Sequence, residues 1–244
     1  MPRQITLRPT ARILVRWPLG TLLVAWRYLW LTTPLHRTEE AGDLSDLPPE
    51  LPRGSVDELT QRIEDGVGLL WHRRFHIRIE ASPMRADEVL AAVAGDLNAI
   101  APTETAVFRK TKGRDGELTT GDEYVVHMPG PWDGPVRVVN RTATSFRLAT
   151  LRGHLEAGQV EFRVDPTPGA LQFTIETWNR AGSRLVDFLY TRLGLAKEIQ
   201  LNMWVRCCLG IARTARGTAR GGVTIRTRRV DYGHIEGRAA PVSG

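Results

Sequence analysis

The chain has few cysteines, with only Cys207 and Cys208 among its 244 residues. The two are adjacent on a predicted helix, where neighbouring side chains point about 100° apart, so a disulfide bond between them is not expected. The sequence offers no disulfide framework and no residue spacing that is typical of a metal site. We therefore expect a cytoplasmic protein that binds no metal.

The sequence also lacks the motifs that mark common cofactor-binding and catalytic folds. It contains no phosphate-binding loop, no dinucleotide-binding glycine pattern and no nucleophile elbow. The glycine-rich segment 113–121 is not followed by a predicted helix, so we interpret it as a hairpin loop. No cofactor is expected.

No apolar run is long enough to form a clear membrane span. The run from Trp17 to Trp26 has about ten residues, whereas a spanning helix requires about 20. Residues 13–35 would reach that length, but they place two arginines in the bilayer, each costing up to about 3 kcal/mol near its centre. We therefore predict that residues 1–35 form a basic, tryptophan-rich hydrophobic helix at a membrane surface. A helix docked on the protein or on a second copy, and a true span, are the alternatives. The predicted membrane contacts are Trp17, Trp26 and Trp30.

Acidic residues are absent from residues 1–31 and from residues 213–230, which contain five and six arginines. Basic ends of this kind suit an anionic surface, either phospholipid or nucleic acid. The second stretch lacks interleaved aromatic residues that would stack on bases, so nucleic acid is not the expected partner. We expect an anionic membrane surface, at the inner face of the plasma membrane. The alternative is that the arginines are solvated and aid solubility.

Composition divides the chain into four parts. Residues 36–55, after the N-terminal helix, are rich in proline and acid and are interpreted as a linker. A globular domain is predicted over residues 56–217, opening with a short helix. The basic residues 218–244 are interpreted as a partly disordered tail that could hold one short strand.

Seven segments alternate apolar and polar residues as half-buried strands do. A helix is predicted over residues 84–100, and short connections between the later strands favour antiparallel pairing. One face of this sheet is apolar and the other is charged, so we expect a core-facing side and a solvated side. The segments are residues 75–81, 106–112, 122–128, 136–142, 145–151, 159–165 and 170–178. The predicted solvated side carries His127, Arg137, Arg147, Glu161, Arg163 and Glu176.

The longest amphipathic segment is residues 183–212. Its apolar residues recur at steps of three and four, which places them on one stripe of a helix. A stripe of this length requires a large apolar surface, and the predicted sheet supplies one. We therefore predict an α+β fold in which a curved antiparallel sheet of about seven strands grips a long C-terminal helix. The N-terminal hydrophobic helix is an addition to that core.

This element order resembles the START-like helix-grip (SRPBCC) superfamily over roughly residues 70–215. The superfamily includes lipid-transfer domains, polyketide cyclases and hormone-binding proteins. The resemblance implies a cavity between the sheet and the C-terminal helix.

A second resemblance lies in the segment 145–164. It is similar to a bacterial family of unknown function that carries a Thr-Leu-x-Gly-His-x-Glu-x-Gly motif. This chain departs from the family at Gln159, where an acid is common, and at residues 179–181, where the family often has Ser-Arg-Pro. The resemblance implies a divergent member, and it transfers a fold but no activity. The matching residues are Thr150, Leu151, Gly153, His154, Glu156, Gly158 and Phe162.

These features together predict a protein that binds or transports an apolar small molecule, lipid or polyketide-like in character. The ligand would lie between the sheet and the C-terminal helix. The alternative for the same side chains is an ordinary packed core. The predicted lining residues are Tyr124, Val126, Met128, Phe146, Phe162, Phe173, Phe188, Ile199 and Met203.

A cyclase- or dehydrase-type enzyme is the second, less favoured hypothesis. Its acid–base candidates at the cavity mouth are His154, Glu156 and His127. The alternative is that His154 and Glu156 hydrogen-bond their own loop, with Gly153 and Gly158 forming the turn. The sequence leaves the oligomeric state open.

Overall fold

The computed structural model describes residues 34–103, 106–128, 133–188 and 195–233, and of residues 188 and 195–199 it describes the backbone alone. The predicted N-terminal helix and its membrane contacts Trp17, Trp26 and Trp30 lie outside this part of the chain. Within these ranges, no helix is both long and apolar enough to cross a membrane.

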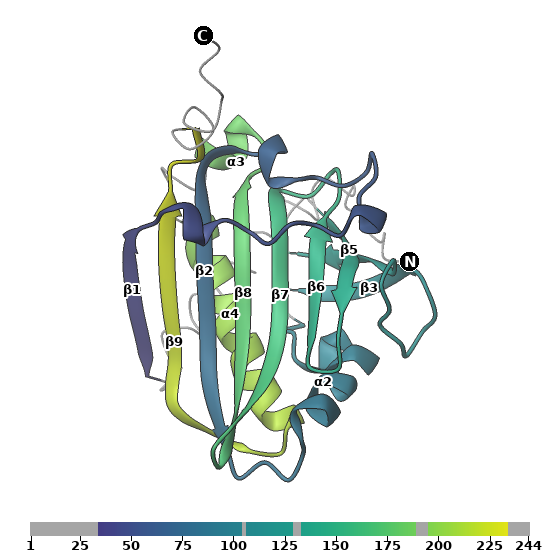
Figure 1. Ribbon diagram of the computed structural model, residues 1–244, viewed down its shortest axis with the longest axis vertical. Helices are drawn as coiled ribbons and strands as arrows, with labels where there is room; N and C mark the ends of the chain where they lie inside the picture. Colours follow the sequence, from purple (N-terminus) through teal and green to yellow (C-terminus); the bar gives the residue numbers. More distant parts are fainter. Residues whose placement is uncertain (1–33, 104–105, 129–132, 189–194, 234–244) are drawn as a thin grey trace, which may run out of the picture.

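A nine-stranded sheet forms the centre of the described structure (Figure 1). Its order is β1-β9-β2-β8-β7-β6-β5-β4-β3, and all neighbours are antiparallel except the parallel pair β1 and β9. The predicted segments correspond to β2 to β8, so an α+β fold with a mostly antiparallel sheet is confirmed, and the number of strands was underestimated by two. The strands are β1 (Leu35–Ala41), β2 (Val67–Glu80), β3 (Val107–Lys112), β4 (Glu123–His127), β5 (Asp133–Arg141), β6 (Ser145–Thr150), β7 (Glu156–Thr167), β8 (Ala170–Ala181) and β9 (Thr218–Val230).

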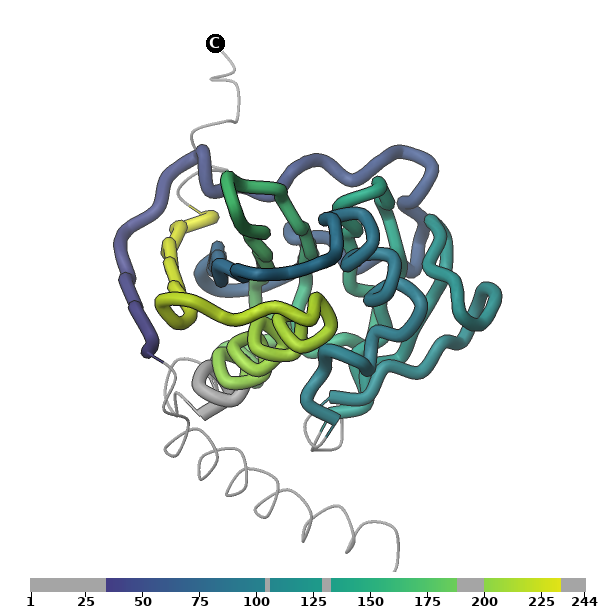
Figure 2. The backbone as a smooth tube through the Cα atoms, turned by 90° about the horizontal axis from the view of Figure 1, so that it is seen from below, coloured from purple at the N-terminus to yellow at the C-terminus, as the bar shows by residue number. Residues whose placement is uncertain are grey.

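Helices α2 (Ala86–Gly95) and α4 (Leu195–Thr214) lie on the same face of the sheet, which curves around them (Figures 1 and 2). We call this the inner face and the opposite one the outer face. The predicted helix over residues 183–212 is observed as α3 (Arg184–Phe188) and α4, and the residues between them lie outside the described ranges. The described ranges also contain four short 3₁₀ helices: η1 (Leu44–Asp46), η2 (Arg53–Ser55), η3 (Ile63–Asp65) and η4 (Leu97–Ala99).

The main core lies between the inner face and the two helices. The apolar sides of β2 and β8, with Phe75 and Phe173, pack with the stripe of α4 that includes Cys208 and Ile211. Gly210 allows α4 to approach η4 closely, since an added Cβ would lie 2.6 Å from the carbonyl oxygen of Ile100. The inner face is therefore the core side that alternation predicted.

Residues 42–66, the crossing segment, run over the outer face from β1 and then return to the start of β2 (Figure 1). Near the middle of this path, the side chain of Gln159 on β7 donates a hydrogen bond to the carbonyl of Pro49 at 2.8 Å. Further along, the hydroxyl of Ser55 donates to the carbonyl of Val139 on β5 at 3.2 Å. The predicted linker 36–55 thus contributes strand β1 and covers part of the sheet.

The outer face is less solvated than the strand pattern predicted. Arg137, Arg147 and Glu176 were expected to be wet, but their exposed fractions are 6%, 7% and 6%. The crossing segment buries them, and a second apolar cluster forms beneath it. That cluster consists of Leu47, Ile63, Leu70, Trp178, Val230 and Tyr232.

Residues 218–230, predicted to belong to a partly disordered tail, form β9 between β1 and β2. Val223 and Ile225 face the core and are fully or almost fully buried. The short strand that the sequence allowed at residues 223–227 lies within β9, and the observed strand is longer because it pairs along both of its edges. Carboxylates on neighbouring elements form ion pairs with Arg220 and Arg228 of this strand.

Candidate functional site

The Thr150–Gly158 segment turns from β6 into β7 at one end of the sheet. Gly153 adopts a φ of +98° in the turn, which favours glycine. Gly158 lies inside β7, where an added Cβ would collide with the carbonyl oxygen of Trp178. Both glycines are therefore required by the backbone.

His154 binds the backbone of this turn. Its Nδ1 lies 2.9 Å from the backbone nitrogen of Glu156 and accepts that N–H. Burial lowers the pKa of His154, so the ring is neutral and able to act as an acceptor. The other edge of the ring packs on Gly134, where an added Cβ would lie 2.9 Å from Nε2. These contacts match the alternative in which His154 holds the loop.

The carboxylate of Glu156 points to different partners. Its Oε1 accepts a hydrogen bond from Nδ2 of Asn179 at 2.6 Å, and its Oε2 accepts one from Nε2 of Gln200 at 2.8 Å. Asn179 comes from β8 and Gln200 from α4, so the carboxylate joins the sheet to the helix. The carboxylate of Glu156 was predicted to pair with the His154 ring. In the structure the ring bonds instead to the backbone N–H of Glu156.

Gln200 also binds a buried arginine. Its Oε1 accepts a hydrogen bond at 2.6 Å from Nη1 of Arg73, whose side chain is fully buried. The guanidinium carbon of Arg73 lies 4.9 Å from the centre of the Trp71 ring. A neutral amide on α4 therefore links a buried cation on β2 to a buried anion on β7. We call Arg73, Glu156, Asn179 and Gln200 the inner polar cluster.

Three further polar groups line the same region without a hydrogen-bond partner in the described part of the chain. They are Oγ1 of Thr177, Oδ1 of Asn179 and Nε1 of Trp204, and all three side chains are buried. Thr177 and Asn179 share the inner face of β8, and Trp204 is one helical turn beyond Gln200. Buried polar groups are nearly always satisfied, so three such groups close together distinguish this region from the rest of the core.

The predicted lining residues lie on the inner face next to this cluster. Tyr124, Val126, Phe146, Phe162 and Phe173 are buried in the main core, and Met128 and Met203 pack against it. Phe162 meets the Trp204 ring edge to face, with centroids 5.8 Å apart. The side chains of Phe188 and Ile199 lie outside those described. Their role as a ligand surface stays a prediction.

His127 lies away from the inner polar cluster. It alternates with the inward-facing Val126, and its Nδ1 lies 2.8 Å from Oδ1 of Asp133 on the exposed outer side. Of the three predicted acid–base residues, only Glu156 directs its functional group into the cluster. No group of three or more ligating side chains suited to a metal occurs in the ranges that the structure describes.

Sequence reasoning missed Arg73, Asn179 and Gln200. Arg73 is in phase with the apolar residues of β2, and Gln200 falls one turn before Trp204. A polar residue in phase with an apolar stripe is the signal that would have identified both.

A separate pocket of about 430 Å³ lies under the crossing segment on the outer face. Its walls come from residues 48–56 and from η3, and β7 forms its floor. The lining residues are Pro48, Pro49, Glu50, Leu51, Arg53, Val56, Arg62, Ile63, Glu64, Gly158 and Gln159.

Several solved structures are similar to this chain at low sequence identity. The KanY protein is 12% identical, with 59% of this chain and 96% of that chain covered and a TM-score of 0.43. The major latex-like protein 151 of Panax ginseng is 15% identical, covering 55% and 95%, with a TM-score of 0.39. A hypothetical protein of Helicobacter pylori is 8% identical, covering 70% and 97%, with a TM-score of 0.45. Similarity at this level carries no information on ligand or activity.

Comparison with curated proteins gives no match. A family model described as a domain of unknown function, DUF1990, matches residues 72–208, which include most of β2, the strands β3 to β8 and most of α4. The matched range contains the inner polar cluster and the Thr150–Gly158 segment. With more than half of its length matched, the chain belongs to the DUF1990 family of domains of unknown function.

Proposed function

We propose that this protein binds an amphipathic small molecule between the inner face of the sheet and α4. The apolar body of the ligand, lipid or polyketide-like, contacts the aromatic side chains of the inner face. Its polar end reaches the inner polar cluster. The observation that carries this proposal is the set of three buried polar groups, on Thr177, Asn179 and Trp204, that have no partner in the described chain.

The chemistry of the cluster favours a neutral polar group on the ligand. The groups left without a partner, on Thr177, Asn179 and Trp204, are all uncharged, so an uncharged polar group suits them and avoids burying a further charge. A hydroxyl can donate to Oδ1 of Asn179 or Oγ1 of Thr177 and can accept from Nε1 of Trp204. We therefore expect an alcohol, or a carbonyl compound that uses the indole alone.

Catalysis is the less favoured function. Of the three acid–base candidates, His154 is bound to its loop and His127 faces outward. Both carboxylate oxygens of Glu156 already accept hydrogen bonds from amide donors, on Asn179 and Gln200. A cyclase- or dehydrase-type reaction would have to use this carboxylate as its base.

Binding can be tested on the full-length chain by displacement of the fluorescent probe N-phenyl-1-naphthylamine. The competitors are 1-dodecanol and dodecane, which differ by one hydroxyl. We expect both to compete and the alcohol to bind about 5-fold more tightly, as one net hydrogen bond of about 1 kcal/mol implies.

The matched variants are Thr177→Val and Thr174→Val. Both threonines are buried in β8, but Thr174 lies on the outer face. Thr177→Val should abolish the preference for the alcohol, and Thr174→Val should keep it. Failure of both competitors, or equal effects of the two substitutions, would overturn the proposal.

We further propose that residues 1–35 attach the protein to an anionic membrane surface, as the basic, tryptophan-rich composition predicts. Flotation with phosphatidylserine-containing liposomes should recover the full chain and not a variant lacking residues 1–35. Equal recovery of the two would contradict the attachment.

A further inference from the structure

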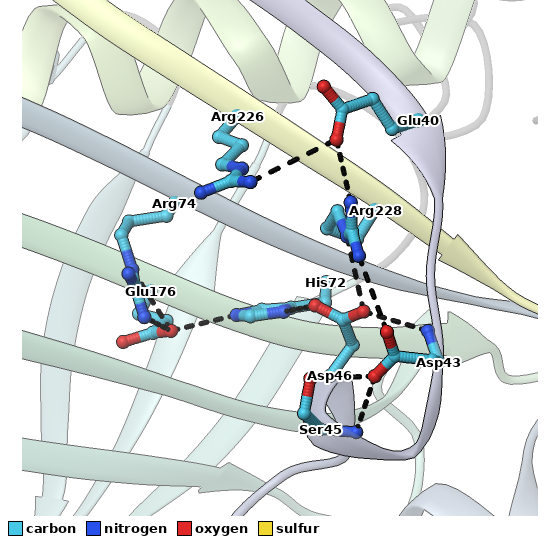
Figure 3. A network of polar contacts seen from close by, with 9 residues as sticks. All are labelled: Glu40, Asp43, Ser45, Asp46, His72, Arg74, Glu176, Arg226 and Arg228. Atoms are coloured by element: carbon cyan, nitrogen blue, oxygen red, sulfur yellow. Dashed lines mark hydrogen bonds and ion pairs between the residues drawn. The ribbon is translucent and has the colours of Figure 1, made fainter.

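The crossing segment is fastened to the outer face through Asp46, a buried carboxylate in η1. Its Oδ1 lies 2.8 Å from Nδ1 of His72 on β2 (Figure 3). Its Oδ2 accepts hydrogen bonds from Nε of Arg228 on β9 at 3.2 Å and from the backbone N–H of Asp43 at 2.9 Å. One side chain of the crossing segment thus contacts two strands.

The second nitrogen of His72 faces another carboxylate. Its Nε2 lies 2.7 Å from Oε1 of Glu176 on β8, which also accepts from Nη2 of Arg74 at 2.5 Å. The His72 ring stacks on Trp178, with centroids 5.3 Å apart and planes 8° apart. The imidazole is therefore fixed between Asp46 and Glu176 and cannot rotate without leaving the stack.

Both carboxylates are ionised at neutral pH. Burial would raise the pKa of Asp46, but hydrogen bonds from Asp43, His72 and Arg228 outweigh it and lower the pKa. Burial of Glu176 is likewise outweighed by His72 and Arg74, so its pKa is lowered. An ionised carboxylate only accepts hydrogen bonds. Both ring nitrogens of His72 must therefore donate, which only the protonated imidazolium can do.

The surrounding charges favour the same state. Ion pairs around His72 join β1, the turn before η1, η1, β2, β8 and β9 (Figure 3). Arg163 of β7 adds three more pairs, and carboxylates outnumber arginines in the whole set. A negative surrounding stabilises a cation. The acids are Glu40, Asp43, Asp46, Glu161, Asp165 and Glu176, and the bases are Arg74, Arg163, Arg226 and Arg228.

We propose that His72 is a proton-dependent clamp that holds the first part of the crossing segment, residues 42–47, on the outer face. Protonated His72 joins Asp46 to Glu176. Deprotonation places a lone pair of the ring against a carboxylate, so η1 loses its bond to β2 and is held by Arg228 alone. The clamp is closed when His72 is protonated and open when that proton is lost.

Release stays local because the far end of the segment has its own attachment. Asp57 Oδ2 lies 2.8 Å from Nη1 of Arg137, and Ser55 is bonded to β5. Neither contact involves His72. The carbonyl of Pro49 is likewise held by Gln159 on β7 at 2.8 Å, so the wall of the 430 Å³ outer pocket keeps its place when the clamp opens.

The test is hydrogen exchange of the full-length protein, corrected for intrinsic rates, at pH 6 and pH 9. The reporters are the amides of Asp43, Ser45, Asp46 and Leu47, whose hydrogen bonds depend on the η1 geometry. We expect their protection to fall about 10-fold between the two pH values. His72→Gln, which cannot bridge two carboxylates as a cation, should show low protection at both.

His76→Gln is the matched control, because His76 lies on the same outer side of β2, two outward-facing positions further along, and packs near Arg74. It should show the wild-type pH dependence. Protection that is independent of pH in the wild type, or a pH dependence kept by His72→Gln, would overturn the clamp.

A second measurement does not depend on a folded variant. Nitrogen-15 NMR of the histidine rings in the wild-type protein should show both His72 nitrogens protonated at pH 6. A neutral His72 ring at that pH would contradict the proposal.

Discussion

Gly158 lies where β7 passes too close to β8 for any side chain. An added Cβ would collide with the carbonyl oxygen of Trp178, and the φ of +153° is itself unfavourable for other residues. Neighbouring Thr150 donates to the Gly158 carbonyl at 3.2 Å and accepts the Gly158 N–H at 2.9 Å. Gly158 therefore sets the backbone path that brings Glu156 to the inner polar cluster.

Gly158→Ala should lower the free energy of unfolding by about 3 kcal/mol or more, because the backbone must shift to remove the collision. Gly169→Ala is the control, since Gly169 has a φ of +69° with open space around it. That change should cost about 1 kcal/mol, from conformation alone. Urea unfolding of both variants measures the difference, and equal losses would contradict the steric argument.

Other individual residues followed sequence reasoning closely. Cys207 and Cys208 are both free and buried, and burial raises the pKa of Cys207 to about 12. Sequence reasoning did not identify Arg73 and Gln200 as site residues, because each is a polar residue on an apolar stripe. Only their meeting in space, with Glu156 between them, gives a physical reason for their burial.

At the scale of elements, β9 differs most from its prediction. Its arginines suggested a solvated tail, yet its alternate residues face the main core between β1 and β2. The short helix predicted near residue 56 was also wrong, because that region forms turns, η3 and the start of β2. Local patterns identify half-buried strands well, but a strand with charged neighbours on its outer face needs its partners to be recognised.

Ile225→Ala should lower the free energy of unfolding by about 3 kcal/mol, because it removes a core-facing side chain that is 1% exposed. Thr224→Ala, one residue earlier on the partly exposed outer face, should cost less than about 1 kcal/mol. Thermal or urea unfolding checks both. Two small, similar losses would mean that residues 218–230 contribute little to the core.

For the whole molecule, carboxylates with lowered pKa values make the free energy of unfolding depend on pH in the acidic range. A hydrogen bond from Arg137 lowers the pKa of Asp57 to about 2. Burial of Asp122 is outweighed by Lys110 and Thr119, so its pKa is lowered as well. A depressed folded-state pKa stabilises the protein above the unfolded value of about 4, and this contribution is lost as the pH falls through the folded value.

The free energy of unfolding should therefore decrease steadily between about pH 5 and pH 2. The double variant Asp57→Asn/Asp122→Asn should be less stable than the wild type at pH 7. Its free energy of unfolding should also decrease less than that of the wild type on acidification. Glu58→Gln, at an exposed position beside Asp57, should keep the wild-type dependence. Urea unfolding at each pH measures these slopes, and a double variant with an unchanged slope would contradict the assignment.

The sequence alone determined seven of the strands, helix α2, the existence of a C-terminal helix and which face of the sheet enters the core. Those features follow from periodicity, which is a property of neighbouring residues. Tertiary structure decided the rest. Contacts between distant segments decide three features. Residues 36–66 cover the outer face of the sheet and do not serve as a free linker, and residues 218–230 form a strand. His154 bonds to the backbone of Glu156 and not to its carboxylate. Burial of a charged group is favourable only when its partner is present, so the inner polar cluster and the His72 clamp exist only in the folded chain.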